Sequence, residues 1–319
     1  MELTLGVDAG GTASRAVVAT PAGRVLGSGR AGGGNPVSRG PAKAASAIAE
    51  AVRQALGDLD ASRLTAVCVG IAGVGALQQR HVAAEFAAMW SDLGVVCPVR
   101  YLDDPLLGFV AGAAETSGHV LLAGTGAVAL RIENLQVTAC ADGLGGVLGD
   151  EGSGYWLGRE ITRAAVRQLA EGRPGLLAQL VVDALLGPGG DRSPRVAHAI
   201  AELVQSDPVG TLPPLSPLIT AAARAGDPVA AEIADSAAQR LVASLASVRE
   251  AASEEPIILA GGVLTSAGPV RSRVVALCSR RWPHALIASA GDTALAAAWL
   301  AWDPRPDWHS WFARYAPES

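Results

Sequence analysis

The sequence lacks the marks of several large protein classes. It has 319 residues, a net charge of −5 and a pI near 5.6, and it contains no run of basic residues. A nucleic-acid partner is therefore not expected. No apolar stretch reaches the length of a membrane span, and the chain opens on a strand-like run rather than a secretory leader. We expect a cytoplasmic, globular protein with no membrane partner.

Cysteines are few and far apart: Cys68, Cys97, Cys140 and Cys278 form no Cys-x-x-Cys pair. This spacing disfavours a zinc site or a disulfide framework and favours buried, reduced thiols. A Walker phosphate loop and a dinucleotide-binding glycine fingerprint are also missing. The length allows two domains, and a hydrophobic content of 50% supplies their cores.

The first turn of the chain has the composition of a polyphosphate site. An apolar run from Leu3 leads to Asp8, and two glycines and two hydroxyl residues follow: Gly10, Gly11, Thr12 and Ser14. Glycine lets backbone N–H groups approach a phosphate, hydroxyls can donate to its oxygens, and a carboxylate can hold Mg²⁺. A second apolar run follows at once, which predicts a hairpin. The alternative is a plain hairpin whose glycines serve only the turn.

The same plan occurs a second time. A buried strand from His119 leads into Gly124, Thr125 and Gly126, and another apolar strand runs to Arg131. Each unit is followed by a third strand and a glycine-rich segment. This duplication predicts two similar domains that face each other across a cleft, with both turns on one polyphosphate.

Three further stretches carry polar or glycine signals. Asp103 and Asp104 end a strand expected over 95–102; one can cap the helix predicted over 106–115, and the other can act as a general base. Asn35 follows a glycine run, and its amide can donate to and accept from a sugar; a loop without a task is the alternative. Gly261 and Gly262 end a strand where a flat ligand could approach the backbone, or they simply terminate it.

The remaining pattern is mainly helical. Helices are expected over 41–56, 77–93, 149–169, 214–225 and 228–252, and Asp150 and Glu151 are expected in the first turn of their helix. A buried strand is expected over 63–71, and Asp292 is expected to cap a helix over 293–302. The tail from Asp303, with Trp308 and Trp311, is expected on the surface or at a dimer contact.

These motifs, in this order, resemble the N-acetylglucosamine kinase-like branch of the BadF/BadG/BcrA/BcrD ATPase family. The resemblance rests on Asp8 to Thr12, Asp103 to Pro105, Ala123 to Gly126, Gly149 to Ser153 and Ala260 to Val263. It implies an α/β fold of two ribonuclease H-like (actin-like ATPase) domains, over residues 1–115 and 116–290. The helix over 291–302 would pack back on the first domain.

The resemblance also implies an ATP-dependent amino-sugar kinase that forms N-acetylglucosamine 6-phosphate. Asp8 would place Mg²⁺, and Asp104 would be the base. The phosphates and nucleoside would contact Gly10, Gly11, Thr12, Ser14, Gly124, Thr125, Gly126, Gly261 and Gly262. The sugar would contact Asn35, Gly73, Asp104, Gly145 and Asp150. A homodimer is expected.

Three positions depart from the family pattern: Ala127 replaces a serine of the second turn, Ala72 replaces a sugar-contacting serine, and Leu144 replaces a tryptophan near the acetamido site. The identity of the sugar therefore stays open. The rival hypothesis is an ATPase activator of a reductase or dehydratase, which would carry an iron–sulfur cluster between subunits. Cys140 alone lies near the corresponding region, which disfavours this hypothesis. A nucleotide sensor without catalysis is disfavoured by Asp104.

Overall fold

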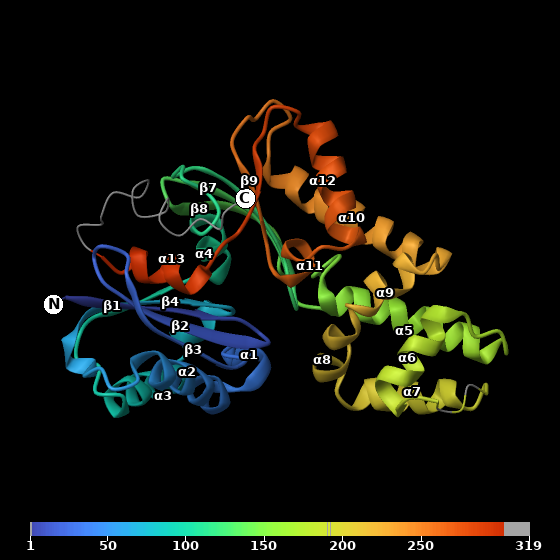
Figure 1. The fold of residues 1–319 in the computed structure, drawn as a ribbon, viewed down its shortest axis with the longest axis horizontal. Coiled ribbons are helices and arrows are strands. Elements are labelled where there is room, and N and C mark those ends of the chain that lie inside the picture. The colour runs from blue at the N-terminus through green and yellow to red at the C-terminus, as the bar shows by residue number, and fades with distance from the viewer. Residues whose placement is uncertain (1, 190, 192, 303–319) are drawn as a thin grey trace. The chain divides into compact units, whose positions relative to one another are not determined.

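A computed structural model describes residues 2–189, 191 and 193–302 (Figure 1). The predicted packing of the tail with Trp308 and Trp311 lies outside these residues. The chain divides into two compact units, which we describe separately. The first comprises the chain up to Thr116, Glu133–Gln136 and the segment that begins at Ala290; the second comprises Ser117–Ile132 and Val137–Ser289.

The first unit is built on a five-stranded sheet in the order β3-β2-β1-β4-β5. Its strands are β1 (Leu3–Ala9), β2 (Ala13–Ala19), β3 (Val25–Gly32), β4 (Leu64–Ile71) and β5 (Val99–Leu102). Strand β1 pairs antiparallel with β2 and parallel with β4. The carboxyl ends of β1, β4 and β5 therefore meet at one edge of the sheet.

Helices cover both faces of this sheet, namely α1 (Pro36–Arg39), α2 (Pro41–Leu56), α3 (Arg80–Asp92), α4 (Asp104–Val110) and α13 (Thr293–Leu300), with short 3₁₀ turns at Ala61–Arg63 and Val74–Gln78. Leu5 and Val7 of β1 point into the core shared with α2 and α3. Thr4 and Gly6 face α13 instead, because successive side chains of a strand alternate. The Thr4 hydroxyl donates to the Ala298 carbonyl at 3.0 Å.

The sheet of the second unit repeats the topology of the first, in the order β8-β7-β6-β9-β10. Its strands are β6 (Gly118–Ala123), β7 (Ala127–Glu133), β8 (Gln136–Asp142), β9 (Ile257–Ala260) and β10 (Ile287–Ser289). Strand β6 pairs antiparallel with β7 and parallel with β9, as β1 does with β2 and β4. The predicted duplication of a strand, glycine turn and strand is confirmed.

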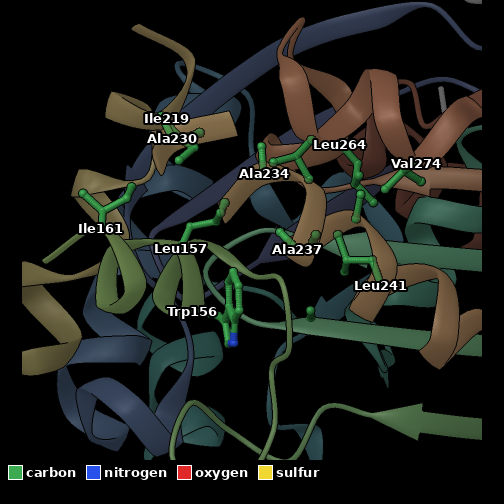
Figure 2. Close-up of a cluster of buried hydrophobic side chains, with 14 of the residues drawn as sticks. Trp156, Leu157, Ile161, Ile219, Ala230, Ala234, Ala237, Leu241, Leu264 and Val274 are labelled. Carbon is green, nitrogen blue, oxygen red and sulfur yellow. The ribbon is translucent and has the colours of Figure 1, made fainter. Parts of the chain in front are cut away.

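The helices of the second unit form a large apolar core. They are α5 (Gly154–Ala170), α6 (Leu176–Leu186), α7 (Val196–Ser206), α8 (Pro208–Thr211), α9 (Leu218–Arg224), α10 (Pro228–Val248), α11 (Gly262–Thr265) and α12 (Pro269–Arg281), with a 3₁₀ turn at Pro213–Leu215. Buried residues of α10 recur every three or four positions, as in Ala230, Ala234, Ala237 and Leu241, and Figure 2 shows them in one apolar cluster with Trp156 and Leu157 of α5.

Several predicted boundaries move. Strand β5 starts at Val99 rather than Val95, directly after Pro98, which cannot donate to a neighbouring strand. Helix α4 ends at Val110 rather than at 115, shortly before Gly112. Helix α10 ends at Val248. The helix expected from 214 is a short 3₁₀ turn followed by α9.

One correction affects the site directly. The prediction that Asp150 and Glu151 lie in the first turn of a helix is wrong, because α5 begins only at Gly154. Its cap is Ser153, whose hydroxyl accepts the Trp156 N–H at 3.1 Å. Asp150 has a left-handed backbone, with φ of 56°. The two carboxylates therefore belong to a loop rather than to a helix.

In the described part of the chain, we find no helix that is both long and apolar enough to cross a membrane.

Candidate active site

The first glycine turn packs against the glycine run that follows β3, Gly33 and Gly34. The turn closes through the Gly10 N–H, which donates to the Ala13 carbonyl at 3.0 Å, and the Gly34 N–H donates to the Gly10 carbonyl at 2.9 Å. A Cβ on Gly33 would lie 2.2 Å from the Gly11 carbonyl oxygen. The run is therefore a fitted support for the turn and not a loop without a task.

Strand alternation decides which side chains of the hairpin reach the site. Thr12 is exposed at the turn, but Ser14 points to the side of α2 and is completely buried. Within the described residues the Ser14 hydroxyl has no hydrogen-bond partner. A Cβ on Gly34 would lie 2.6 Å from it, so Ser14 lies under the glycine run. Thr12, rather than Ser14, therefore presents a hydroxyl at the surface of the turn.

Asp8 lies at the end of β1 on the face that carries α13. Its Oδ2 accepts from the Arg15 guanidinium and from the Thr293 hydroxyl, both at 2.5 Å. Arg15 is the cross-strand partner of Asp8 in the hairpin, and Thr293 is the first residue of α13. The Asp8 side chain is only 13% exposed, so these two contacts fix it firmly.

Asp104 follows β5 and is the first residue of α4. The helix can approach the sheet because Gly70 of β4 has no side chain; a Cβ there would lie 2.2 Å from Leu107 Cδ1 and 3.4 Å from the Asp104 Cα. Burial, followed by the negative charges of Asp8 and Asp103, raises the pKa of Asp104 to about 7. Asp103 is exposed and occupies the capping position of α4.

Asn35 and Gly73 lie against each other near this edge. Asn35 caps α1, and its Oδ1 accepts the N–H groups of Val37 at 2.8 Å and Ser38 at 3.3 Å. Gly73 follows β4 with φ of 76°, and a Cβ on it would lie 3.1 Å from the Asn35 Oδ1. Because that oxygen already accepts two bonds, the NH₂ group of Asn35 is the part of the side chain left for a ligand.

The second glycine turn joins β6 to β7 in the second unit. The amides that open α5 donate to its carbonyls, Gly154 N–H to Gly124 at 2.7 Å and Tyr155 N–H to Thr125 at 3.1 Å. Gly261 lies against the base of the turn with φ of 80°, and a Cβ on it would lie 2.4 Å from the Ala123 carbonyl. The backbone of the second turn therefore packs closely against Gly261, and Gly262 follows directly.

Asp150 touches this second turn directly. Its Oδ1 accepts the Ala127 N–H at 3.2 Å, and a Cβ on Gly126 would lie 2.8 Å from its Oδ2. Burial is the main cause of a raised pKa of Asp150, and the negative charge of Asp142 adds to the rise. The backbone amides of Ala127 and Gly145 lower this pKa in part, because they stabilise the ionised carboxylate. Gly145 thus lies next to the Asp150 carboxylate.

The structure therefore assembles two sets of predicted residues. In the first unit, Asp8, Gly10, Gly11, Thr12, Asn35, Gly73 and Asp104 gather at the carboxyl edge of the sheet. In the second unit, Gly124, Thr125, Gly126, Gly145, Asp150, Gly261 and Gly262 surround the second turn. Ser14 is the predicted residue that the fold buries.

Sequence reasoning missed three residues that hold these sets together. Arg15 could have been found, because a tight turn at Gly10 and Gly11 pairs it with Asp8 across the hairpin. Asp142 carries the weaker signal of an Asp-Gly turn pair. Thr293 lies 285 positions from Asp8, and no local pattern connects the two.

Two repeated sheets, each with a glycine turn between its first two strands, define an actin-like ATPase fold. The chain belongs to the BadF/BadG/BcrA/BcrD ATPase family, which it matches over residues 5–280. A candidate N-acetylglucosamine kinase from Chromobacterium violaceum has a similar fold, with a TM-score of 0.75, 22% identity and coverage of 93% of this chain and 97% of that one. The ROK family glucokinase of Streptomyces griseus, solved with glucose and AMPPNP, gives a TM-score of 0.60 at 23% identity over 94% and 99% of the two chains.

Two curated relatives are similar in sequence. The N-acetylmuramic acid/N-acetylglucosamine kinase of Clostridium acetobutylicum is 25% identical over 169 residues, or 52% of this chain and 54% of that protein. The N-acetyl-D-glucosamine kinase of Dictyostelium discoideum is 27% identical over 176 residues, again 52% and 54%. In these alignments the chain spans about half the length of the curated relatives it matches.

Proposed function

We propose that this protein is an amino-sugar kinase, which transfers the γ-phosphate of ATP to a sugar hydroxyl, with the 6-hydroxyl of N-acetylglucosamine as the first candidate. The family, the kinase names of both curated relatives and the two fitted glycine turns support this proposal. The observation that carries it is Asp104, a carboxyl group poised near neutral pH beside Asp8.

Asp104 has the properties of a general base for this reaction. With a pKa of about 7 it is ionised in a large share of molecules at neutral pH and is still basic enough to take a proton. The sugar hydroxyl would give its proton to the Asp104 carboxylate as its oxygen bonds to the γ-phosphorus. The bond between that phosphorus and the β,γ-bridging oxygen breaks, and ADP leaves.

The residues of the first unit fit a magnesium–phosphate group. Among the described residues no three His, Cys, Asp or Glu side chains are grouped to hold a metal by themselves. Mg²⁺ commonly binds through one or two carboxylates together with substrate phosphates and water. Asp8 is suited to be that carboxylate. After burial, the negative charges of Asp8 and Asp103 contribute to the raised pKa of Asp104, and a cation would balance this charge. When bound, Mg²⁺ would neutralise charge on the phosphates.

The phosphate contacts would come from the two turns. In the first unit, the Gly10 N–H closes the turn on the Ala13 carbonyl, which leaves the Gly11 amide and the exposed Thr12 to meet the phosphates. In the second unit, Gly124 to Gly126 form the corresponding turn. Gly261 and Gly262 are proposed next to the nucleoside, since no side chain there separates the ligand from the backbone.

The sugar contacts are proposed on both units. Asn35 would donate through its NH₂ group, and Gly73 beside it leaves room for a ring. In the second unit, Asp150 and Gly145 would meet the sugar. The loop that leads to Asp150 exposes Leu144, Val147 and Leu148 by 67%, 86% and 81%. Such aliphatic groups suit the methyl of an acetamido substituent better than a bare hydroxyl.

The activator hypothesis gains no support from the cysteines. Cys140 lies exposed on β8, whereas Cys68 and Cys278 are buried in separate cores and Cys97 is partly buried. The homodimer and the cytoplasmic location stay predictions from the sequence. Light scattering of the purified full chain would measure its mass and decide the first.

The decisive experiment measures ADP release with ATP and Mg²⁺ across N-acetylglucosamine, N-acetylmuramic acid, glucosamine, N-acetylmannosamine, glucose and no sugar. Strong stimulation by one sugar, with a sugar phosphate among the products, would support the proposal and name the substrate. ADP release that is indifferent to every sugar would overturn it, and an assay for bound iron would then test the activator hypothesis.

A further inference from the structure

The Asp142 carboxylate is the centre of the loop that carries Asp150. Its Oδ1 accepts the Asp150 N–H at 2.6 Å, and its Oδ2 accepts the Glu151 N–H at 2.8 Å. Both oxygens are therefore used by consecutive backbone amides. Hydrogen bonds to an ionised carboxylate are about twice as strong as neutral ones, so this clamp is a strong local restraint.

The backbone around the clamp is costly to form. The backbone of Asp142 and of Asp150 lies in the left-handed region, with φ of 66° and 56°, which residues other than glycine rarely adopt. Gly149 is buried against the clamp, and a Cβ on it would lie 2.3 Å from the Asp142 Oδ1. A conformation of this kind persists only where specific contacts hold it, and the Asp142 carboxylate supplies two of them.

The restraint on Asp150 extends to the second glycine turn. The carboxylate of Asp150 accepts the Ala127 N–H and lies over Gly126. The carboxylate of Asp142 instead accepts the N–H groups of Asp150 and Glu151. The Asp142 side chain thus acts on the turn through Asp150, while the backbone beside it is tied to the turn separately, by the Gly143 N–H that donates to the Ala127 carbonyl at 2.9 Å.

We infer that Asp142 is a positioning residue that holds the Asp150 carboxylate between the second phosphate turn and the sugar. This inference rests on the proposed function for the nature of the ligand. Asp150 is suited to this place because its carboxylate contacts the turn at Ala127 and Gly126 and also lies beside the amide of Gly145, which is proposed on the sugar side.

The test that needs no turnover is amide hydrogen exchange of the full chain, resolved at single residues. Asp142→Asn replaces one acceptor by an NH₂ group that faces a backbone N–H. Asp207→Asn is the matched control, because Asp207 is an aspartate of the second unit whose Oδ1 likewise accepts a backbone N–H, that of Gly210, at 2.9 Å. We expect Asp142→Asn to speed exchange at Asp150, Glu151 and Ala127 by about tenfold or more, and the control to leave all three unchanged.

Faster exchange confined to Asp150 and Glu151, or no change at any of the three, would overturn the inference, since Asp142 would then be a local turn former. Gly149→Ala provides a second variant if Asp142→Asn folds poorly. Its added Cβ would displace the same carboxylate without removing it. The expected exchange pattern is the same, and an unchanged Ala127 amide would again contradict the inference.

Kinetics with the sugar that stimulates the wild type provide the functional arm. We expect Asp142→Asn to raise the KM for the sugar by about 10- to 100-fold, with the KM for ATP changed by less than about twofold, and we expect Asp207→Asn to change neither. An equal rise of both KM values would contradict positioning of the sugar contact. If no sugar stimulates the wild type, the proposed function fails on its own, and hydrogen exchange still decides the role of Asp142.

Discussion

The replacement of Asp104 by Asn tests the site from two sides, because activity and stability should change in opposite directions. The proposed base takes a proton from the sugar, and removal of such a group commonly costs about 10² to 10⁴ in rate. The same carboxylate is expensive to keep ionised, since burial and the charges of Asp8 and Asp103 raise its pKa from 3.8 to about 7. We therefore expect an inactive variant that is more stable than the wild type at alkaline pH.

The size of the stability gain follows from the pKa. One pKa unit corresponds to about 1.4 kcal/mol, so a rise from 3.8 to about 7 corresponds to a cost of roughly 4 kcal/mol for the ionised form in the folded state. This cost is fully present above pH 7. It declines as the pH falls through the folded-state pKa and is absent below 3.8, where the carboxyl is protonated in both states. Asn carries no charge at any pH and avoids the cost.

Thermal unfolding of the two proteins, without nucleotide or Mg²⁺, measures this difference. We expect Asp104→Asn to raise the melting temperature at pH 8 by about 2 to 4 °C per kcal/mol recovered, and the gap should close as the pH falls towards 4. Asp103→Asn is the matched control, because Asp103 is the exposed neighbour and should retain activity within a few-fold. A melting temperature of Asp104→Asn that equals or falls below that of the wild type at pH 8 would refute the desolvation argument, and near-full activity would refute the base assignment.

Three other variants test separate contacts. Asp8→Asn should raise the Mg²⁺ concentration needed for half-maximal activity by about tenfold or more, measured by magnesium titration; an unchanged titration would remove Asp8 from the metal site. Gly126→Ala places a Cβ 2.8 Å from the Asp150 Oδ2. We expect it to lower kcat/KM for the sugar by at least about tenfold and the free energy of unfolding by about 1 to 2 kcal/mol. Wild-type kinetics would contradict the close packing of Asp150 on this turn. Gly6→Ala places a Cβ 2.0 Å from the Ala294 carbonyl oxygen. We expect denaturant titrations to show that it destabilises the first unit by about 3 kcal/mol or more. A loss below about 1 kcal/mol would show that α13 can move away from β1 without cost.

Much of the fold was accessible from local patterns. The hairpin at Gly10, the helix over 41–56 and the repetition of the plan at Gly124 follow from alternation, helical spacing and glycine placement, which are properties of neighbouring residues. The boundaries that moved have local causes too. Pro98 delays β5, and the left-handed backbone of Asp150 delays α5 until Ser153 can cap it.

The roles of individual side chains were less accessible. Asp8 and Asp104 could be predicted as site residues because each lies at or just after the carboxyl end of a strand, and parallel strands bring these ends together. Ser14 has the same composition signal as Thr12, yet the alternation of β2 turns it towards α2 and buries it. A hydroxyl beside a glycine turn can therefore face a ligand only if its position in the strand points it outwards.

The sequence by itself determined the duplicated plan, the family and the residues that end the strands, because these depend on the order of residues along the chain. Only the tertiary structure decided which of those residues lie together. Thr293 reaches Asp8 from the far end of the chain, Gly70 lets α4 bring Asp104 to the sheet, and Asp142 clamps the Asp150 loop. The physical reason is that the position and pKa of a carboxylate depend on the groups packed around it, and folding collects these groups from distant parts of the chain.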